Sequence, residues 1–328
     1  PIPGVNLKNV FSVRKELSYL IELMDALKKA ENVVVVGGGF IGVEFADEFI
    51  KRGLNVTIVE LLPHCLQLAY DEDFCRIAED KLIERGVKLK TNSRVEEIIG
   101  EGKVEKVRLS SGETLEADLV LIGVGVRPNV ELAKNAGLKI GELGGIWVDE
   151  YMRTSDENIF AVGDCAEKYS FFTKKPSALR LASITAREAR IAGVNVFGLK
   201  RKNIGVIGCF STIIGDLALG VAGLTERMAK ELGFSFVVGM AKAPDKHPAA
   251  MPECKEMQIK LLFEKDSKTL IGGQVAGGKT VGEVTNILSS LIEKKTTAEE
   301  VATFQSVSYT HLRAHETEAD LVCRLLLE

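Results

Sequence analysis

Three glycines and one glutamate are the residues of this chain whose types and spacing best fit a chemical role. Gly37, Gly39 and Gly42 have the spacing G-x-G-x-x-G and follow the four valines 33–36, which predict a strand buried on both faces. In this pattern the first glycine permits a tight turn, the second lets a pyrophosphate approach the backbone, and the third lets the next helix lie close to the strand. Glu60 ends the next apolar run, where a carboxylate can accept the hydroxyls of an adenosine ribose. The pattern therefore predicts a dinucleotide site.

Glu60 also indicates which dinucleotide is bound. Its carboxylate would repel a 2′-phosphate, and residues 61–64 contain no arginine or lysine to attract one. The sequence therefore favours NADH, with NADPH as the weaker candidate.

The elements needed to position these residues can be read from hydrophobic periodicity and turn residues. We expect an amphipathic helix over 14–30 with Leu17, Leu20, Ile21, Met24 and Leu27 on its apolar face. A helix over 71–85 should have Asp71 as its N-cap. The remaining expected elements are a helix over 43–50 and strands over 55–60, 95–99, 104–109, 114–115 and 119–125. Together they predict one nucleotide-binding domain over residues 8–125.

A second region has chemistry of its own. Residues 154–164 predict a turn and a short buried strand that ends in Gly163 and Asp164, and residues 179–196 predict a helix with small residues on one face. Gly163 would let the backbone approach a ligand, and Asp164 would accept hydrogen bonds from ligand hydroxyls. Considered alone, this region fits a capped turn beside a packed helix equally well.

Three motifs together resemble the flavin-dependent pyridine nucleotide–disulfide oxidoreductases. They are Gly37–Glu44, Gly123–Asn129 and Thr154–Ala166. The similarity is greatest to the branch that contains NADH oxidases, coenzyme A-disulfide reductases and NAD(P)H-dependent sulfur reductases, and it covers nearly all of residues 1–305. It implies an α/β fold in which a Rossmann-like NAD(P)-binding domain is inserted in an FAD-binding domain, here partial, and is followed by an α+β dimerisation domain.

The resemblance also implies roles for individual residues. Asp164 would bind the ribityl chain of FAD, and the helix around Ala182 would direct its N-terminus at the flavin ring. Phe40 would control access of the nicotinamide to the flavin, Glu44 would lie near the nicotinamide, and Gly125 would line the same side. The cofactor-binding residues expected in all are Gly37, Gly39, Phe40, Ile41, Gly42, Glu44, Glu60, Gly125, Gly163, Asp164, Leu181 and Ala182. In this branch the redox cysteine lies in a segment upstream of Pro1, so we assign no catalytic residue here, and we expect no metal site.

These interpretations divide the chain into five parts. Residues 1–7 are a connector, 8–125 the NAD(H)-binding domain, 126–198 the C-terminal part of the FAD-binding domain, and 199–305 a truncated dimerisation domain. Residues 306–328 resemble one reading frame of a sequencing-library adapter with its index, and we expect them to be non-native.

Composition limits the possible partners and compartment. The net charge of −4 over 328 residues includes −2 from the suspect tail, where two arginines face four acids. This balance gives no reason to expect nucleic acid or an anionic membrane as a partner. Six cysteines without a C-x-x-C motif favour a reduced, cytoplasmic protein.

We therefore expect the parent protein to be a homodimeric enzyme in which NADH reduces FAD. The reduced flavin would then reduce a disulfide, a polysulfide, oxygen or a small redox protein. The alternative is a non-catalytic NADH-binding module or assembly subunit. The chain by itself should bind NADH weakly and hold no FAD. Residues 273–280 match the P-loop pattern G-x-x-x-x-G-K-[ST], but their strand reads as half of a hairpin, so we reject ATP binding.

Overall fold

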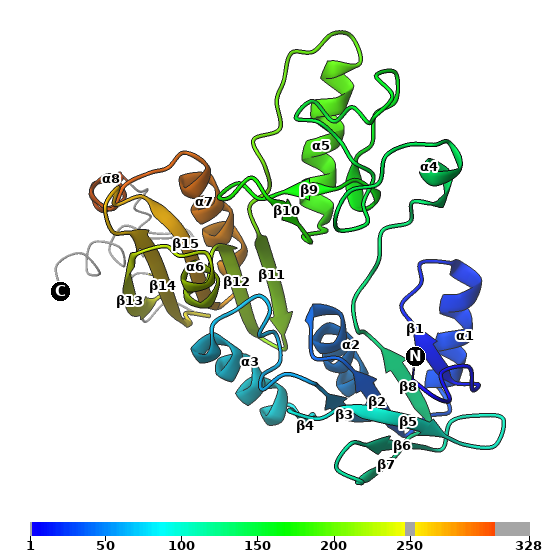
Figure 1. The fold of residues 1–328 in the computed structure, drawn as a ribbon. Helices are drawn as coiled ribbons and strands as arrows, with labels where there is room; N and C mark the ends of the chain where they lie inside the picture. The colour runs from blue at the N-terminus through cyan, green and yellow to red at the C-terminus, as the bar shows by residue number, and fades with distance from the viewer. Residues whose placement is uncertain (1, 247–252, 306–328) are drawn as a thin grey trace. The chain divides into compact units, whose positions relative to one another are not determined.

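The computed structural model describes residues 2–246 and 253–305 (Figure 1). The suspect tail 306–328 lies outside the described residues. The chain divides into two compact units. The first contains residues up to Val124 and those from Cys209 onward, and the second contains Gly125–Gly208.

A parallel sheet forms the centre of the N-terminal part of the first unit. Its strand order is β1-β8-β2-β3-β4, and all four pairings are parallel. The bounds are Val10–Ser12 for β1, Asn32–Val36 for β2, Asn55–Val59 for β3, Lys88–Lys90 for β4 and Leu119–Ile122 for β8. Val33 and Val35 belong to one core cluster, whereas Val34 and Val36 belong to another. The prediction of a strand buried on both faces is confirmed.

Three helices accompany this sheet: α1 (Leu17–Leu27), α2 (Phe40–Lys51) and α3 (Glu72–Glu84). The expected apolar face of α1 is confirmed at Leu27, which is buried, but is wrong at Leu17 and Ile21, which are 75% and 53% exposed. Leu23, which was not expected on that face, is buried instead. The helix carries apolar residues on more than one face, so the sequence could not show which face would pack against the sheet. The prediction that Asp71 precedes α3 is confirmed, although its side chain caps a different helix. Its carboxylate accepts the backbone N–H groups of Glu226 and Arg227.

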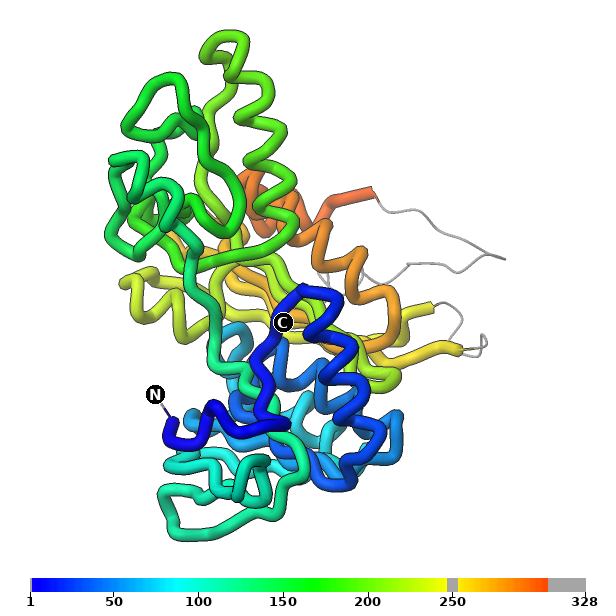
Figure 2. Tube along the Cα trace, turned by 90° about the vertical axis from the view of Figure 1, so that its right-hand side faces the viewer, coloured from blue at the N-terminus to red at the C-terminus, as the bar shows by residue number. Residues whose placement is uncertain are grey.

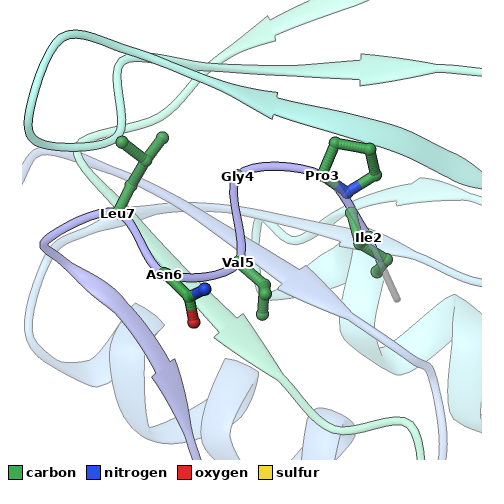
Figure 3. A pocket seen from close by; sticks show the side chains of 6 residues that line it. All are labelled: Ile2, Pro3, Gly4, Val5, Asn6 and Leu7. Atoms are coloured by element: carbon green, nitrogen blue, oxygen red, sulfur yellow. The ribbon is translucent and has the colours of Figure 1, made fainter.

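A small antiparallel sheet shares the second of these core clusters. It contains β5 (Val95–Ile99), β6 (Lys106–Leu109) and β7 (Thr114–Glu116), close to the expected ranges. The segment 2–7 packs beside β5, where the Ile98 N–H donates to the Pro3 carbonyl. This segment lines a hollow of about 470 Å³ (Figure 3). No side chain that lines the hollow is titratable, so it offers no acid–base chemistry.

The C-terminal part of the first unit is an antiparallel sheet with helices. Its order is β11-β12-β15-β14-β13, and helix α7 packs on β12 and β15 (Figures 1 and 2). Because β15 runs antiparallel to both neighbours, residues 273–280 lack the parallel-sheet setting of a P-loop. The bounds are Cys209–Ile214 (β11), Leu217–Gly223 (β12), Phe236–Pro244 (β13), Glu256–Glu264 (β14), Leu270–Gly277 (β15), Glu226–Glu231 (α6), Val281–Glu293 (α7) and Ala298–Ala302 (α8).

The second unit has little regular structure. Its elements are α4 (Glu131–Asn135), a 3-10 turn (Gly163–Cys165), β9 (Lys168–Tyr169), β10 (Pro176–Ser177) and α5 (Ala182–Asn195). The short strand expected before Gly163 is wrong, because only an isolated bridge between Arg153 and Phe160 forms there. The backbone enters the 3-10 turn at Gly163 with φ +79°, which ends the extended stretch.

Candidate functional site

In the turn between β2 and α2, the three glycines of the G-x-G-x-x-G pattern are required for different reasons. Gly37 has φ +104°, and a Cβ there would lie 2.7 Å from the Gly123 carbonyl oxygen; a Cβ at Gly42 would lie 1.9 Å from the Gly37 oxygen. Packing within the protein therefore requires these two glycines. Gly39 differs, because its φ is −74° and a Cβ would meet nothing within 4 Å. The fold itself does not require glycine at this position, whereas an approaching phosphate group would.

Glu60 lies beside this turn because β3 pairs in parallel with β2. Its Oε2 accepts the Gly38 N–H at 2.5 Å, and its Oε1 accepts the Leu62 N–H at 2.7 Å. Two backbone donors thus hold a buried carboxylate in one orientation. Each oxygen keeps a further lone pair with which to accept a hydroxyl.

Phe40 and Glu44 lie on the first turns of α2. The Phe40 ring stacks on Phe210, with centroids 5.3 Å apart and planes 19° apart, and it meets the Tyr70 ring edge-on at 6.0 Å. Glu44 is exposed, and its Oε1 accepts the Thr212 hydroxyl at 2.9 Å. Ile41, the residue after Phe40 in the sequence, is half-buried.

The first unit thus contains seven of the expected site residues, and the second unit contains the other five. The first unit holds Gly37, Gly39, Phe40, Ile41, Gly42, Glu44 and Glu60. The second holds Gly125, Gly163, Asp164, Leu181 and Ala182.

In the second unit, the 3-10 turn packs against α5. A Cβ at Gly163 would lie 3.1 Å from the Thr185 methyl group, so glycine is needed for this contact. Asp164 is exposed. Helix α5 begins at Ala182 after Leu181, and no side chain caps it and no acid lies in its first turn. The positive end of this helix dipole is therefore open to a negatively charged group.

A buried ion pair that sequence reasoning missed holds this turn on α5. Lys168 Nζ lies 2.7 Å from Glu188 Oε2, and the two side chains are only 2% and 1% exposed. The same Glu188 oxygen accepts the Gly163 N–H at 2.9 Å, and Lys168 also donates to the Ala166 and Gly163 carbonyls. One signal was present in the sequence, because Glu188 falls on the face of α5 that buries Ile184 and Ile191.

Three described cysteines, Cys65, Cys75 and Cys165, lie at least partly buried in the packed interior. Cys65 and Cys75 are buried and form no disulfide within residues 2–246 and 253–305, and burial raises the pKa of Cys75 to about 12. Cys165 is half-buried, with its Sγ 3.4 Å from the Val162 carbonyl oxygen. Within residues 2–246 and 253–305, no three His, Cys, Asp or Glu side chains are grouped so that they could hold a metal ion. Over the same ranges, no helix is long and apolar enough to span a membrane.

Comparison with known proteins assigns both units to one family. Residues 1–189 match the model of the pyridine nucleotide-disulphide oxidoreductases, and residues 209–316 match the dimerisation domain of the same family. An NADH oxidase of Methanocaldococcus jannaschii is 38% identical over 311 residues, covering 93% of this chain and 67% of that protein. An NAD(P)H coenzyme A polysulfide/persulfide reductase of Pyrococcus horikoshii is 35% identical, covering 94% and 68%.

A solved structure agrees with these relatives. The NAD-dependent persulfide reductase from A. fulgidus has 32% sequence identity and a TM-score of 0.92, covering 99% of this chain and 60% of that one. The chain thus spans about two thirds of the length of the two relatives and three fifths of the solved chain. The two model matches and the three sequence motifs lead to one conclusion: the chain belongs to the pyridine nucleotide-disulphide oxidoreductase family.

Proposed function

We propose that the protein is an FAD- and NADH-dependent oxidoreductase. NADH bound at the β2–α2 turn reduces the flavin, which then reduces a disulfide, a polysulfide, oxygen or a small redox protein. The observation that carries the proposal is the open space at Gly39 beside the fixed Glu60 carboxylate. The relatives named above are enzymes, and none of them supports the alternative of a non-catalytic module.

Each half of the proposed reaction has residues suited to it. The first-turn N–H groups of α2 bind the pyrophosphate, and Glu60 orients the adenosine ribose. Phe40 and Glu44 then lie on the side of the nicotinamide. FAD, when bound, would supply hydride and electron transfer. Asp164 would accept hydrogen bonds from its ribityl hydroxyls, and the open N-terminus of α5 would stabilise negative charge on the flavin.

The surroundings of Glu60 support NADH rather than NADPH. The Gly38 and Leu62 N–H groups prevent the carboxylate from turning away from a 2′-phosphate. His64, the nearest potential cation of the following loop, has its Nδ1 3.0 Å from a Glu79 carboxylate oxygen. No free cation in residues 61–64 is therefore available to bind that phosphate.

The C-terminal sheet supports a homodimer. Residues 209–316 match the family's dimerisation domain, so we expect two copies to associate through this part of the chain.

Gly39→Ala separates ligand binding from folding and tests the site. A methyl group at Gly39 meets no protein atom, so the free energy of unfolding should change by less than about 0.5 kcal/mol. The methyl group would obstruct the pyrophosphate, and NADH affinity measured by calorimetry should fall at least about tenfold. Gly282→Ala is the matched control, because its Cβ also meets nothing within 4 Å and it lies in α7. Equal NADH binding by Gly39→Ala and wild type would contradict the site.

The enzyme assignment has its own test. The full-length protein should be purified with flavin absorbance, and NADH should bleach that absorbance without oxygen present. A full-length protein without flavin would refute the assignment.

A further inference from the structure

One face of helix α2 rests on the edge strand β11, which lies outside the nucleotide-binding domain (Figure 1). Phe40 stacks on Phe210, and Glu44 accepts the Thr212 hydroxyl. Residues 40 and 44 lie one above the other on a helix, and residues 210 and 212 point to the same side of a strand. The two elements therefore meet in register.

The far end of this contact is anchored by Asp47, one turn beyond Glu44. Its side chain is 3% exposed, and its Oδ1 accepts the N–H of Gly215, in the turn after β11, at 3.1 Å. Arg85 Nε lies 2.6 Å from the same oxygen, and Lys51 Nζ lies 2.8 Å from Oδ2. This buried group fixes the position of β11 along α2, so Phe210 and Thr212 meet their partners at defined positions.

The near end of the contact lies at the N-terminus of α2, where we expect the pyrophosphate that joins the adenosine and nicotinamide halves of the dinucleotide. Phe40 directly follows Gly39 and is the first residue of α2. In the proposed function, Glu60 would hold the adenosine ribose, and the pyrophosphate would lie over the helix N-terminus. The nicotinamide half therefore extends past Phe40 and Glu44. Because Phe40 is half-buried between Phe210 and Tyr70, the position of its ring depends on β11.

We propose that Phe210 and Thr212 are positioning residues for the nicotinamide half of NADH. The inference rests on the proposed function and adds that the dimerisation domain determines how Phe40 and Glu44 meet the nicotinamide. A ring already held between two others loses little freedom on binding, so the stack favours affinity by preorganisation.

NADH and ADP-ribose together provide the test, because ADP-ribose contains the adenosine and pyrophosphate but lacks the nicotinamide. Binding of each ligand to this chain is measured by calorimetry for wild type and Phe210→Ala. We expect NADH affinity to fall about fivefold, since an aromatic stack is lost, and ADP-ribose affinity to stay within about twofold. Ile213→Ala is the control, because residue 213 points to the opposite side of β11 and is 45% exposed.

Three further variants keep the test decisive if Phe210→Ala folds poorly. Phe210→Leu keeps most of the bulk but removes the stack, and it should lower NADH affinity alone. Thr212→Val removes the hydroxyl that donates to Glu44 and should lower NADH affinity. Thr212→Ser retains that hydroxyl and should keep the wild-type NADH affinity. Equal losses for both ligands, unchanged NADH binding in Phe210→Leu and Thr212→Val, or tighter NADH binding would overturn the proposal. A wild-type chain that binds neither ligand would refute the proposed function itself, and with it this inference.

Discussion

Replacing Lys168 by Met should lower the free energy of unfolding, because it removes the positive charge of the buried ion pair in the second unit. The change leaves the Glu188 carboxylate buried without its cation, and breaking a buried pair in this way costs about 3–5 kcal/mol. Glu188 can escape part of this cost by taking up a proton. Protonation costs about 1.4 kcal/mol for each pH unit above the usual pKa, which is 4.5 for this group. The loss in free energy of unfolding caused by Lys168→Met is therefore limited to about 3.4 kcal/mol at pH 7 and about 1.4 kcal/mol at pH 5.5.

The sign of the pH dependence follows from the surroundings of Glu188. Burial raises its pKa, and the Lys168 ammonium opposes that rise. Without Lys168 the pKa rises further, so the folded chain keeps a proton over a pH range in which the unfolded chain has lost it. Stability then falls as pH rises through that range. The deficit of Lys168→Met should be about 2 kcal/mol larger at pH 7 than at pH 5.5.

Urea unfolding at the two pH values measures this deficit. Lys134→Met is the control, because its pair with Glu131 is exposed and should contribute less than about 1 kcal/mol. Lys168→Met/Glu188→Met replaces both charges by apolar groups and should recover most of the loss. A deficit that is the same at both pH values, or that the exposed pair reproduces, would refute the reasoning.

Three further predictions concern the first unit. The Tyr70 hydroxyl is buried and has no hydrogen-bond partner among residues 2–246 and 253–305, so Tyr70→Phe should raise the free energy of unfolding by about 1 kcal/mol; a loss in urea unfolding would indicate a partner. Because burial raises the pKa of Cys75 to about 12, its thiol in the folded chain should react with an aromatic disulfide at pH 8 on the order of a hundredfold more slowly than in urea, and equal rates followed by absorbance would contradict its burial. Glu60→Ala removes the repulsion of a 2′-phosphate, so the ratio of NADPH to NADH affinity should rise about tenfold in calorimetry; an unchanged ratio would remove Glu60 as the cause of the preference.

Predictions from the sequence succeeded where the backbone is governed by near neighbours. The valine run 33–36 became β2, and the three short strands of 95–116 formed close to their expected ranges. In each case the residues that decide the conformation are adjacent in the chain.

Predictions failed where a side chain had to choose among distant partners. Asp71 is the N-cap residue of α3 as expected, but its side chain does not cap that helix. Its carboxylate instead accepts N–H groups at the start of α6 and the amide of Gln274, 203 residues away. Helix α1 has apolar residues on more than one face, and packing into the same core cluster as Val33 and Val35 buried Leu23 rather than Leu17 and Ile21.

The sequence by itself thus determined the glycine turn, the position of Glu60 after the next strand, and the family, because these depend on residue type and local spacing. Only the tertiary structure decided that Phe40 stacks on Phe210, that Glu44 meets Thr212, and that Lys168 pairs with Glu188. The physical reason is that a turn is specified by backbone conformations available to a few consecutive residues. The partner of a buried ring or charge, in contrast, depends on which distant segments the fold brings together.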